Sequence, residues 1–101
     1  MVSGFGKPYL VFLRGIILWR EHKAEEAKDL LEKALVAFRS LSHNPLAEGL
    51  VLSTKAFLCA ANADLGNTAK AKALFSEVES FLIAHRENEL LAACRGPFAT
   101  A

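Results

Sequence analysis

The sequence predicts an all-α protein, and three observations support this prediction. The interior of the 101-residue chain is rich in Ala, Leu, Lys and Glu, which favour helices. Apolar residues recur three and four positions apart over long segments, as they do on the buried side of a helix. Only six glycines and three prolines occur, and most of them lie near the two ends. We therefore expect a single all-helical domain over residues 1–101 that contains five helices.

The first predicted helix begins at about residue 7 or 8, where Pro8 suits a first turn, and ends at Arg20. Its apolar run "YLVFLRGIILW" (Tyr9–Trp19) is too short to span a bilayer and has Arg14 in its middle. We therefore expect no membrane partner. Because this run is strongly apolar but neither spans a bilayer nor resembles a signal peptide, we expect a helix that is buried on more than one side.

The second predicted helix covers about residues 24–41 and completes a first hairpin over about residues 7–41. Its apolar residues follow the spacing of one buried stripe, which predicts that this single face packs on its neighbours. The stripe consists of Ala27, Leu30, Leu31, Ala34, Leu35 and Phe38.

The third predicted helix covers about residues 45–65, with Asn44 as its N-cap and Pro45 in its first turn. Gly66 is expected to end it in the left-handed conformation. Asn67 or Thr68 is expected to cap a fourth helix over about residues 69–84, which completes a second hairpin over about residues 45–84. A short fifth helix over about residues 87–95 is expected to cap the array, and the sequence "RGP" is expected to end this helix. The stripe of the fourth helix is Ala71, Leu74, Phe75, Val78 and Leu82.

The two predicted hairpins form an internal repeat with a shift of 44 positions, as between Ala27 and Ala71. The same shift aligns Gly15 with Cys59, and it aligns the two turns at residues 22 and 66. Small residues are needed where two helices cross closely. We therefore expect Gly15 to cross at Ala27 and Cys59 to cross at Ala71.

The pattern of small and aromatic residues resembles the tetratricopeptide repeat family. The matching residues are Gly15, Ala27 and Ala34 in the first half and Leu58, Gly66, Ala71 and Phe75 in the second. The family repeat has about 34 residues, so this chain is similar to the longer variants, over about residues 9–85. The resemblance implies antiparallel hairpins stacked as a short right-handed superhelix, and a non-enzymatic protein–protein interaction module. A generic bundle of four or five helices is the alternative.

In arrays of this kind the first helix of each hairpin lines a concave face that holds partners. The resemblance therefore implies a bulky ridge on the first helix beside a shallow trough of small residues on the third, suited to a helical segment. The ridge is Tyr9, Phe12, Ile16 and Trp19, with Arg20 beside it, and the trough is Ser53, Ala56, Ala60, Ala63 and Asp64.

Two occupants of this ridge are possible besides a partner helix: the interior of the same chain, or a second copy. Arrays of this kind need about three units to cover their apolar faces, and this chain has two hairpins and one further helix. We therefore predict that the chain self-associates through or near its first helix as a homodimer, because an exposed ridge promotes aggregation.

Other classes of function receive less support. The formal net charge of +1 and the absence of long runs of like charge make nucleic acid an unlikely partner. A small helical regulator that binds nucleic acid through Lys23, Lys28, Lys33 and Arg39 is one alternative. A fragment of a longer repeat-containing regulator is another, and a small enzyme or ligand-binding bundle with a pocket around Trp19 is a third.

No catalytic, metal or cofactor motif is recognised, and no small-molecule substrate is predicted. The residues His22, His43 and His85 fall in expected turns without the spacing of metal ligands. Cys59 and Cys94 are 35 positions apart in apolar contexts, which is typical of reduced core cysteines. The sequence therefore favours a reducing, cytoplasmic compartment.

Overall fold

A computed structural model describes residues 6–41 and 44–95, and 86% of these residues are helical. No strand occurs among them, which confirms the all-α prediction. Each helix begins and ends within two residues of its predicted bounds. The helices are α1 (Gly6–Arg20), α2 (Ala24–Arg39), α3 (Pro45–Asp64), α4 (Thr68–Ala84) and α5 (Asn88–Arg95).

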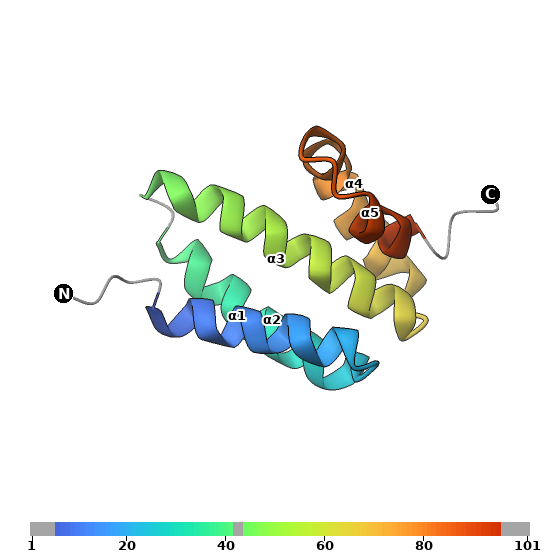
Figure 1. Cartoon of the computed structure of the whole chain (residues 1–101), viewed down its shortest axis with the longest axis horizontal. Helices are drawn as coiled ribbons and strands as arrows, with labels where there is room; N and C mark the ends of the chain where they lie inside the picture. Colours follow the sequence, from blue (N-terminus) through green and yellow to red (C-terminus); the bar gives the residue numbers. More distant parts are fainter. Residues whose placement is uncertain (1–5, 42–43, 96–101) are drawn as a thin grey trace.

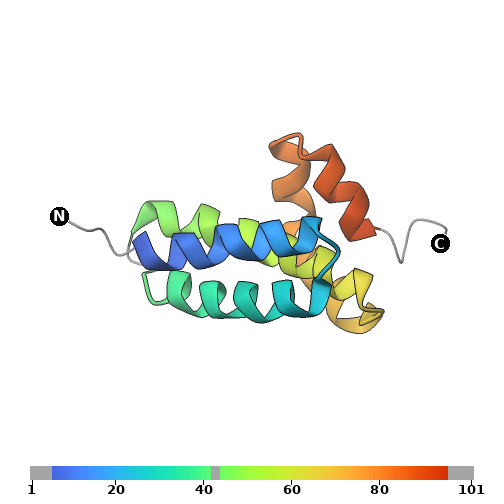
Figure 2. The ribbon, with the colours of Figure 1, turned by 60° about the horizontal axis from the view of Figure 1, so that its bottom comes forward.

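The five helices form stacked antiparallel hairpins, with α3 in the middle of the row (Figure 1). Helix α1 runs alongside α2 (Figure 2). It packs mainly on α2 and touches few residues of α3. On the other side of α3, helix α5 packs on both α3 and α4. Helix α5 therefore packs against both helices of the second hairpin.

Three of the four connections share one turn geometry. Each contains a residue with positive φ, namely His22 (64°), Gly66 (81°) or Arg86 (56°). In each turn the next backbone N–H donates to the carbonyl oxygen five positions back, over 2.9–3.0 Å. This hydrogen bond is typical of a Schellman helix end. The first two turns are 44 positions apart, as the repeat predicts. A break between the fourth and fifth helices was also predicted, but the positive φ at Arg86 was not.

The predicted cap of α3 is confirmed, because the Asn44 side chain accepts a hydrogen bond from the Leu46 backbone N–H over 2.9 Å. The predicted side-chain cap of α4 is wrong. The Asn67 side chain makes no capping hydrogen bond. Its side-chain amide donates instead to Oδ1 of Asn62 over 3.0 Å, which links the turn to α3.

The core consists of two groups of buried side chains that meet at α3. Trp19, Phe57 and Leu74 are partly buried and contact both groups, so the two hairpins share one continuous interior. The group around the first hairpin is Phe12, Ala27, Leu31, Ala34, Leu35, Phe38 and Leu58. The group around the second is Ala56, Cys59, Ala60, Ala71, Val78, Leu82, Leu90, Leu91 and Cys94.

Both predicted helix crossings are present. A Cβ atom placed on Gly15 would lie 3.6 Å from the Ala27 carbonyl oxygen and only 2.8 Å from Cγ of Leu31. In the second hairpin the Cys59 thiol donates a hydrogen bond to the Ala71 carbonyl oxygen over 3.2 Å. The small residues therefore mark the points at which each hairpin closes.

The substitution Gly15→Ala is expected to lower the free energy of unfolding by about 1 kcal/mol. Crowding against Leu31 costs about 1–3 kcal/mol, whereas the gain in helix propensity is about 1 kcal/mol. The matched control is Gly49→Ala in α3, because nothing lies within 4 Å of a Cβ there. It should stabilise the protein by about 0.5–1 kcal/mol in urea unfolding. Equal stabilisation by the two substitutions would show that the crossing has room to spare.

Candidate interaction surface

The predicted ridge on α1 turns largely into the chain. Phe12 has only 6% of its surface exposed, and its ring centroid lies 5.9 Å from that of Phe38 and 6.0 Å from that of Phe57. The Trp19 ring lies 5.6 Å from Phe57, edge to face. Ile16 is partly buried, and Tyr9 is 43% exposed. The ridge therefore packs mainly inside one chain, and Phe12 is not part of an exposed surface.

Phe57 is the residue of this region that the sequence analysis missed. It fills the place where a shallow trough was expected, and it contacts both Phe12 and Trp19. The signal was present, because Phe57 follows Ser53 by four positions and precedes Asp64 by seven, which is one face of a helix. The predicted trough residues Ala56 and Ala60 are instead fully buried.

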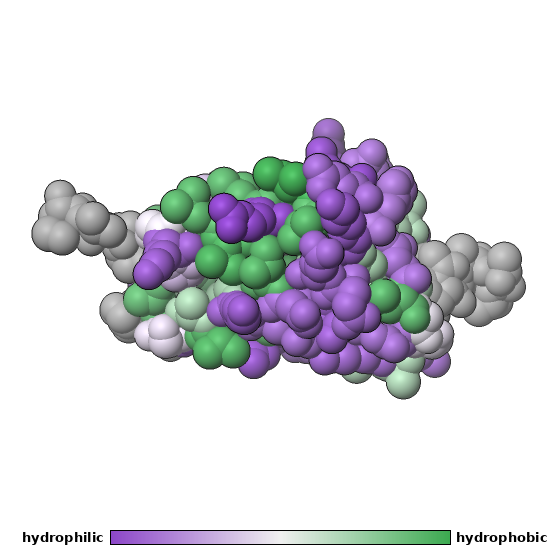
Figure 3. Space-filling model, turned by 90° about the horizontal axis from the view of Figure 1, so that it is seen from below, coloured by the Kyte–Doolittle hydropathy of each residue, from purple (hydrophilic) through white to green (hydrophobic). Residues whose placement is uncertain are grey.

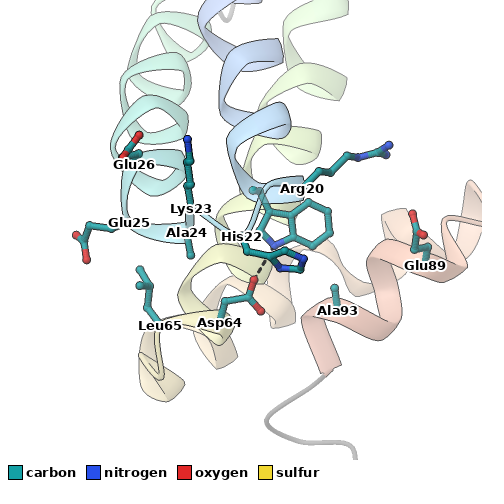
Figure 4. Close-up of a pocket in the computed structure, with 11 residues that line it drawn as sticks. Arg20, His22, Lys23, Ala24, Glu25, Glu26, Asp64, Leu65, Glu89 and Ala93 are labelled. Carbon is teal, nitrogen blue, oxygen red and sulfur yellow. Dashed lines mark hydrogen bonds between the residues drawn. The ribbon is translucent and has the colours of Figure 1, made fainter.

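Trp19, Arg20 and Asp64 do come together, in a cleft of about 850 Å³ between the ends of α1 and α3 and helix α5 (Figure 4). The indole Nε1 of Trp19 donates to Oδ2 of Asp64 over 3.0 Å and joins the two helices. Ala63 is partly buried nearby in α3. The remaining charged lining includes Glu89 of α5 across the cleft.

A second, more apolar groove of about 560 Å³ lies between the first half of α3 and the turn from α4 to α5. Leu46, which is 70% exposed, lies at this groove, and Ser53 and Phe57 of the same face of α3 also line it. This groove and the cleft beside Trp19 are separate hollows, each contributed to by α3 and α5.

The largest uncovered apolar side chains of α1 lie opposite its packed side. Leu10 is 66% exposed, Leu13 37% and Ile17 55%. Leu13 and Ile17 are each two positions from Gly15, so they lie about 200° around the helix from the crossing with α2. We call these three residues the outer stripe of α1. The expectation that α1 is buried on more than one side is wrong for this face within one chain.

The charged end of this region is distinct from its apolar end. Seen from the side of α1 and α2, hydrophobic side chains gather toward the end where the chain begins, and hydrophilic ones toward the turn between the two helices (Figure 3).

Within the described residues, Lys7, Arg14 and Arg20 make no ion pair. The stripe is therefore accompanied by cations that have no counterion within the described chain.

The two cysteines are free and fully buried where α5 meets α3. The Cys94 thiol donates to the Ala56 carbonyl oxygen over 3.2 Å. The neighbouring Cys59 thiol raises the pKa of Cys94, and burial raises it further. The neighbouring Cys94 thiol lowers the pKa of Cys59, against the effect of burial. These thiols fill the interface as small apolar groups.

The other titratable groups form no recognisable centre. His22 and His85 lie exposed in turns, and the His85 ring rests 4.5 Å from the Phe81 ring. His43 lies outside the described residues. Among residues 6–41 and 44–95, no three His, Cys, Asp or Glu side chains are placed to hold a metal ion.

The described fold is thus that of an all-α protein built from stacked hairpins, with its apolar side chains exposed mainly on α1. No protein-family model, curated protein or solved structure matches the chain. The likeness to the tetratricopeptide repeat family therefore stays a prediction. None of the helices in the described ranges has both the length and the hydropathy needed to cross a bilayer.

Proposed function

We propose that the protein is a non-enzymatic, tetratricopeptide-like protein–protein interaction module that docks another protein or a second copy of itself through the outer stripe of α1. One observation carries the proposal: this stripe leaves Leu10, Leu13 and Ile17 in water although the opposite side of α1 is packed. An uncovered apolar face on a small protein is typical of an interaction site.

The arrangement of basic residues favours protein over nucleic acid as the partner. Lys23 lies 3.9 Å from Glu21, and Lys28 lies 3.8 Å from both Glu25 and Asp29. The carboxylates beside these lysines reduce the positive potential that a phosphate backbone requires. We also propose a cytoplasmic location, because two free buried thiols are typical of a reducing compartment.

Substitution of Ile17 with glutamate tests the docking surface whatever its occupant. We would titrate the chain with amphipathic helical peptides of acidic, neutral and basic flanks, and measure its own mass by light scattering. At least one occupant, peptide or second copy, should bind, and Ile17→Glu should remove that binding. Phe12 is unsuitable for this test because it belongs to the core.

The matched control is Leu46→Glu, which changes a leucine that is more exposed than Ile17 but lies on α3 at the second groove. It should leave docking unchanged. If Leu46→Glu removes binding and Ile17→Glu does not, the partner occupies the groove of α3 instead. If no occupant binds the parent chain, the proposed module has no docking function at α1.

A further inference from the structure

We infer that the occupant of the outer stripe is an amphipathic helix of another protein that carries acidic side chains beside its apolar face. This inference rests on the proposed function and names the chemistry of the partner. Helix α1 has three basic residues, Lys7, Arg14 and Arg20, and no acidic residue between Gly6 and Arg20. None of the three cations forms an ion pair within the described chain.

The cations border the stripe on both sides. At 100° per residue, Arg20 lies beside Ile17 on one edge of the stripe, and Lys7 and Arg14 lie beside Leu10 on the other. Glu21, the acid that directly follows α1, faces Lys23 over 3.9 Å. A helix with an apolar stripe between carboxylates is the complement of this surface in both shape and charge.

Neither α1 nor α2 of a second copy supplies that complement. The same face of another α1 would bring three cations against three, because α1 contains no carboxylate. The acidic side of α2 has exposed Glu25 and Glu26, but Val36 is its one large exposed apolar residue. That side therefore offers charge without the apolar cover that the outer stripe needs. These charges favour a different protein over the homodimer expected from the sequence.

A membrane surface is also a weaker match. Basic segments that hold anionic lipid typically carry roughly four to eight Lys or Arg residues, whereas α1 carries three. The formal net charge of the whole chain is only +1. A vesicle of anionic lipid is therefore a competing occupant to be tested, and the acidic helix is the one that the surface fits.

Three fluorescein-labelled peptides would test the inference against the full chain. The three peptides share the same stripe of leucines, and they differ only in the residue beside that stripe, which is Glu, Gln or Lys. Anisotropy titrations should give the tightest binding for the Glu peptide, with affinity falling as salt is added. Arg14→Glu should lower the affinity for the Glu peptide on the order of tenfold and raise the affinity for the Lys peptide. Lys33→Glu, the same charge change on an exposed lysine of α2, should alter neither.

The outcomes separate this inference from the proposed function. Equal affinity for the Glu and Lys peptides, with loss of both in Ile17→Glu, would keep the docking surface and overturn the acidic partner. Self-association that Ile17→Glu removes, without peptide binding, would identify a second copy and likewise overturn it. Binding only to phosphatidylglycerol vesicles would assign the face to a membrane. If a parent chain with native circular dichroism shows no peptide binding, no self-association and no vesicle binding, both proposals are overturned.

Discussion

Replacement of Phe38 with alanine is expected to lower the free energy of unfolding by about 3–5 kcal/mol. Phe38 is fully buried in α2, and its ring packs against the Phe12 ring in a T-shaped arrangement with centroids 5.9 Å apart. The substitution removes apolar burial and leaves a cavity where α1, α2 and α3 meet. A domain of this size has a stability of about 5–15 kcal/mol. The loss would show as a large shift of the urea midpoint.

The matched control for this prediction is Val36→Ala, two positions away on the same helix. Val36 is 67% exposed, so its truncation should change stability by no more than about 0.5 kcal/mol. If Phe38→Ala does not fold, Phe38→Leu retains most of the volume and should give a measurable intermediate loss. Similar effects for Val36→Ala and Phe38→Ala would contradict the placement of Phe38 in the core.

Asn62→Asp is expected to destabilise the protein by about 3–5 kcal/mol at neutral pH, because it introduces an unpaired charge into the interior. Asn62 is fully buried. Its Nδ2 donates to the Leu58 carbonyl oxygen over 2.8 Å, and its Oδ1 accepts from Asn67 over 3.0 Å. An ionised carboxylate would keep the acceptor but lose the donor, and would place negative charge against a carbonyl oxygen.

The effect of Asn62→Asp should depend on pH in one direction. Burial raises the pKa of a carboxyl group above its unfolded value of about 3.9. The neutral acid is tolerated in the folded state, so the penalty is small below the unfolded pKa and grows as pH rises above it. Thermal unfolding of variant and parent from acidic to neutral pH measures this difference. Asn88→Asp, an exposed change at the start of α5, should show no such penalty, and a pH-independent loss at Asn62 would refute the explanation.

The helices and their contacts within each hairpin could be predicted because their signals are local. The stripe of α2, the Asn44 cap and the turn at Gly66 each depend on residues close in sequence. The crossing at Gly15 followed from the repeat, since a close approach needs a residue without a side chain. Such features are determined by spacing and by backbone conformation.

The face that α1 turns to the rest of the chain could not be predicted in the same way. Large apolar residues occur on several sides of the helix, so periodicity does not distinguish Phe12, which is buried, from Leu10, which is exposed. Phe57 of α3 packs against Phe12 and Trp19, and this contact determines which face of α1 is buried. Such a contact between distant parts of the chain belongs to the tertiary packing. The positive φ at Arg86 could not be predicted either, because the turn contains no glycine.

The order of contacts along the row has a kinetic consequence. Apart from α5, which also reaches α3, each helix packs chiefly on its immediate predecessor in the chain. Most contacts therefore close short stretches of polypeptide, and chains with such low contact order fold quickly because little loop entropy is lost before the contacts form. Nucleation in either hairpin can then spread to its neighbour, as in other one-dimensional arrays.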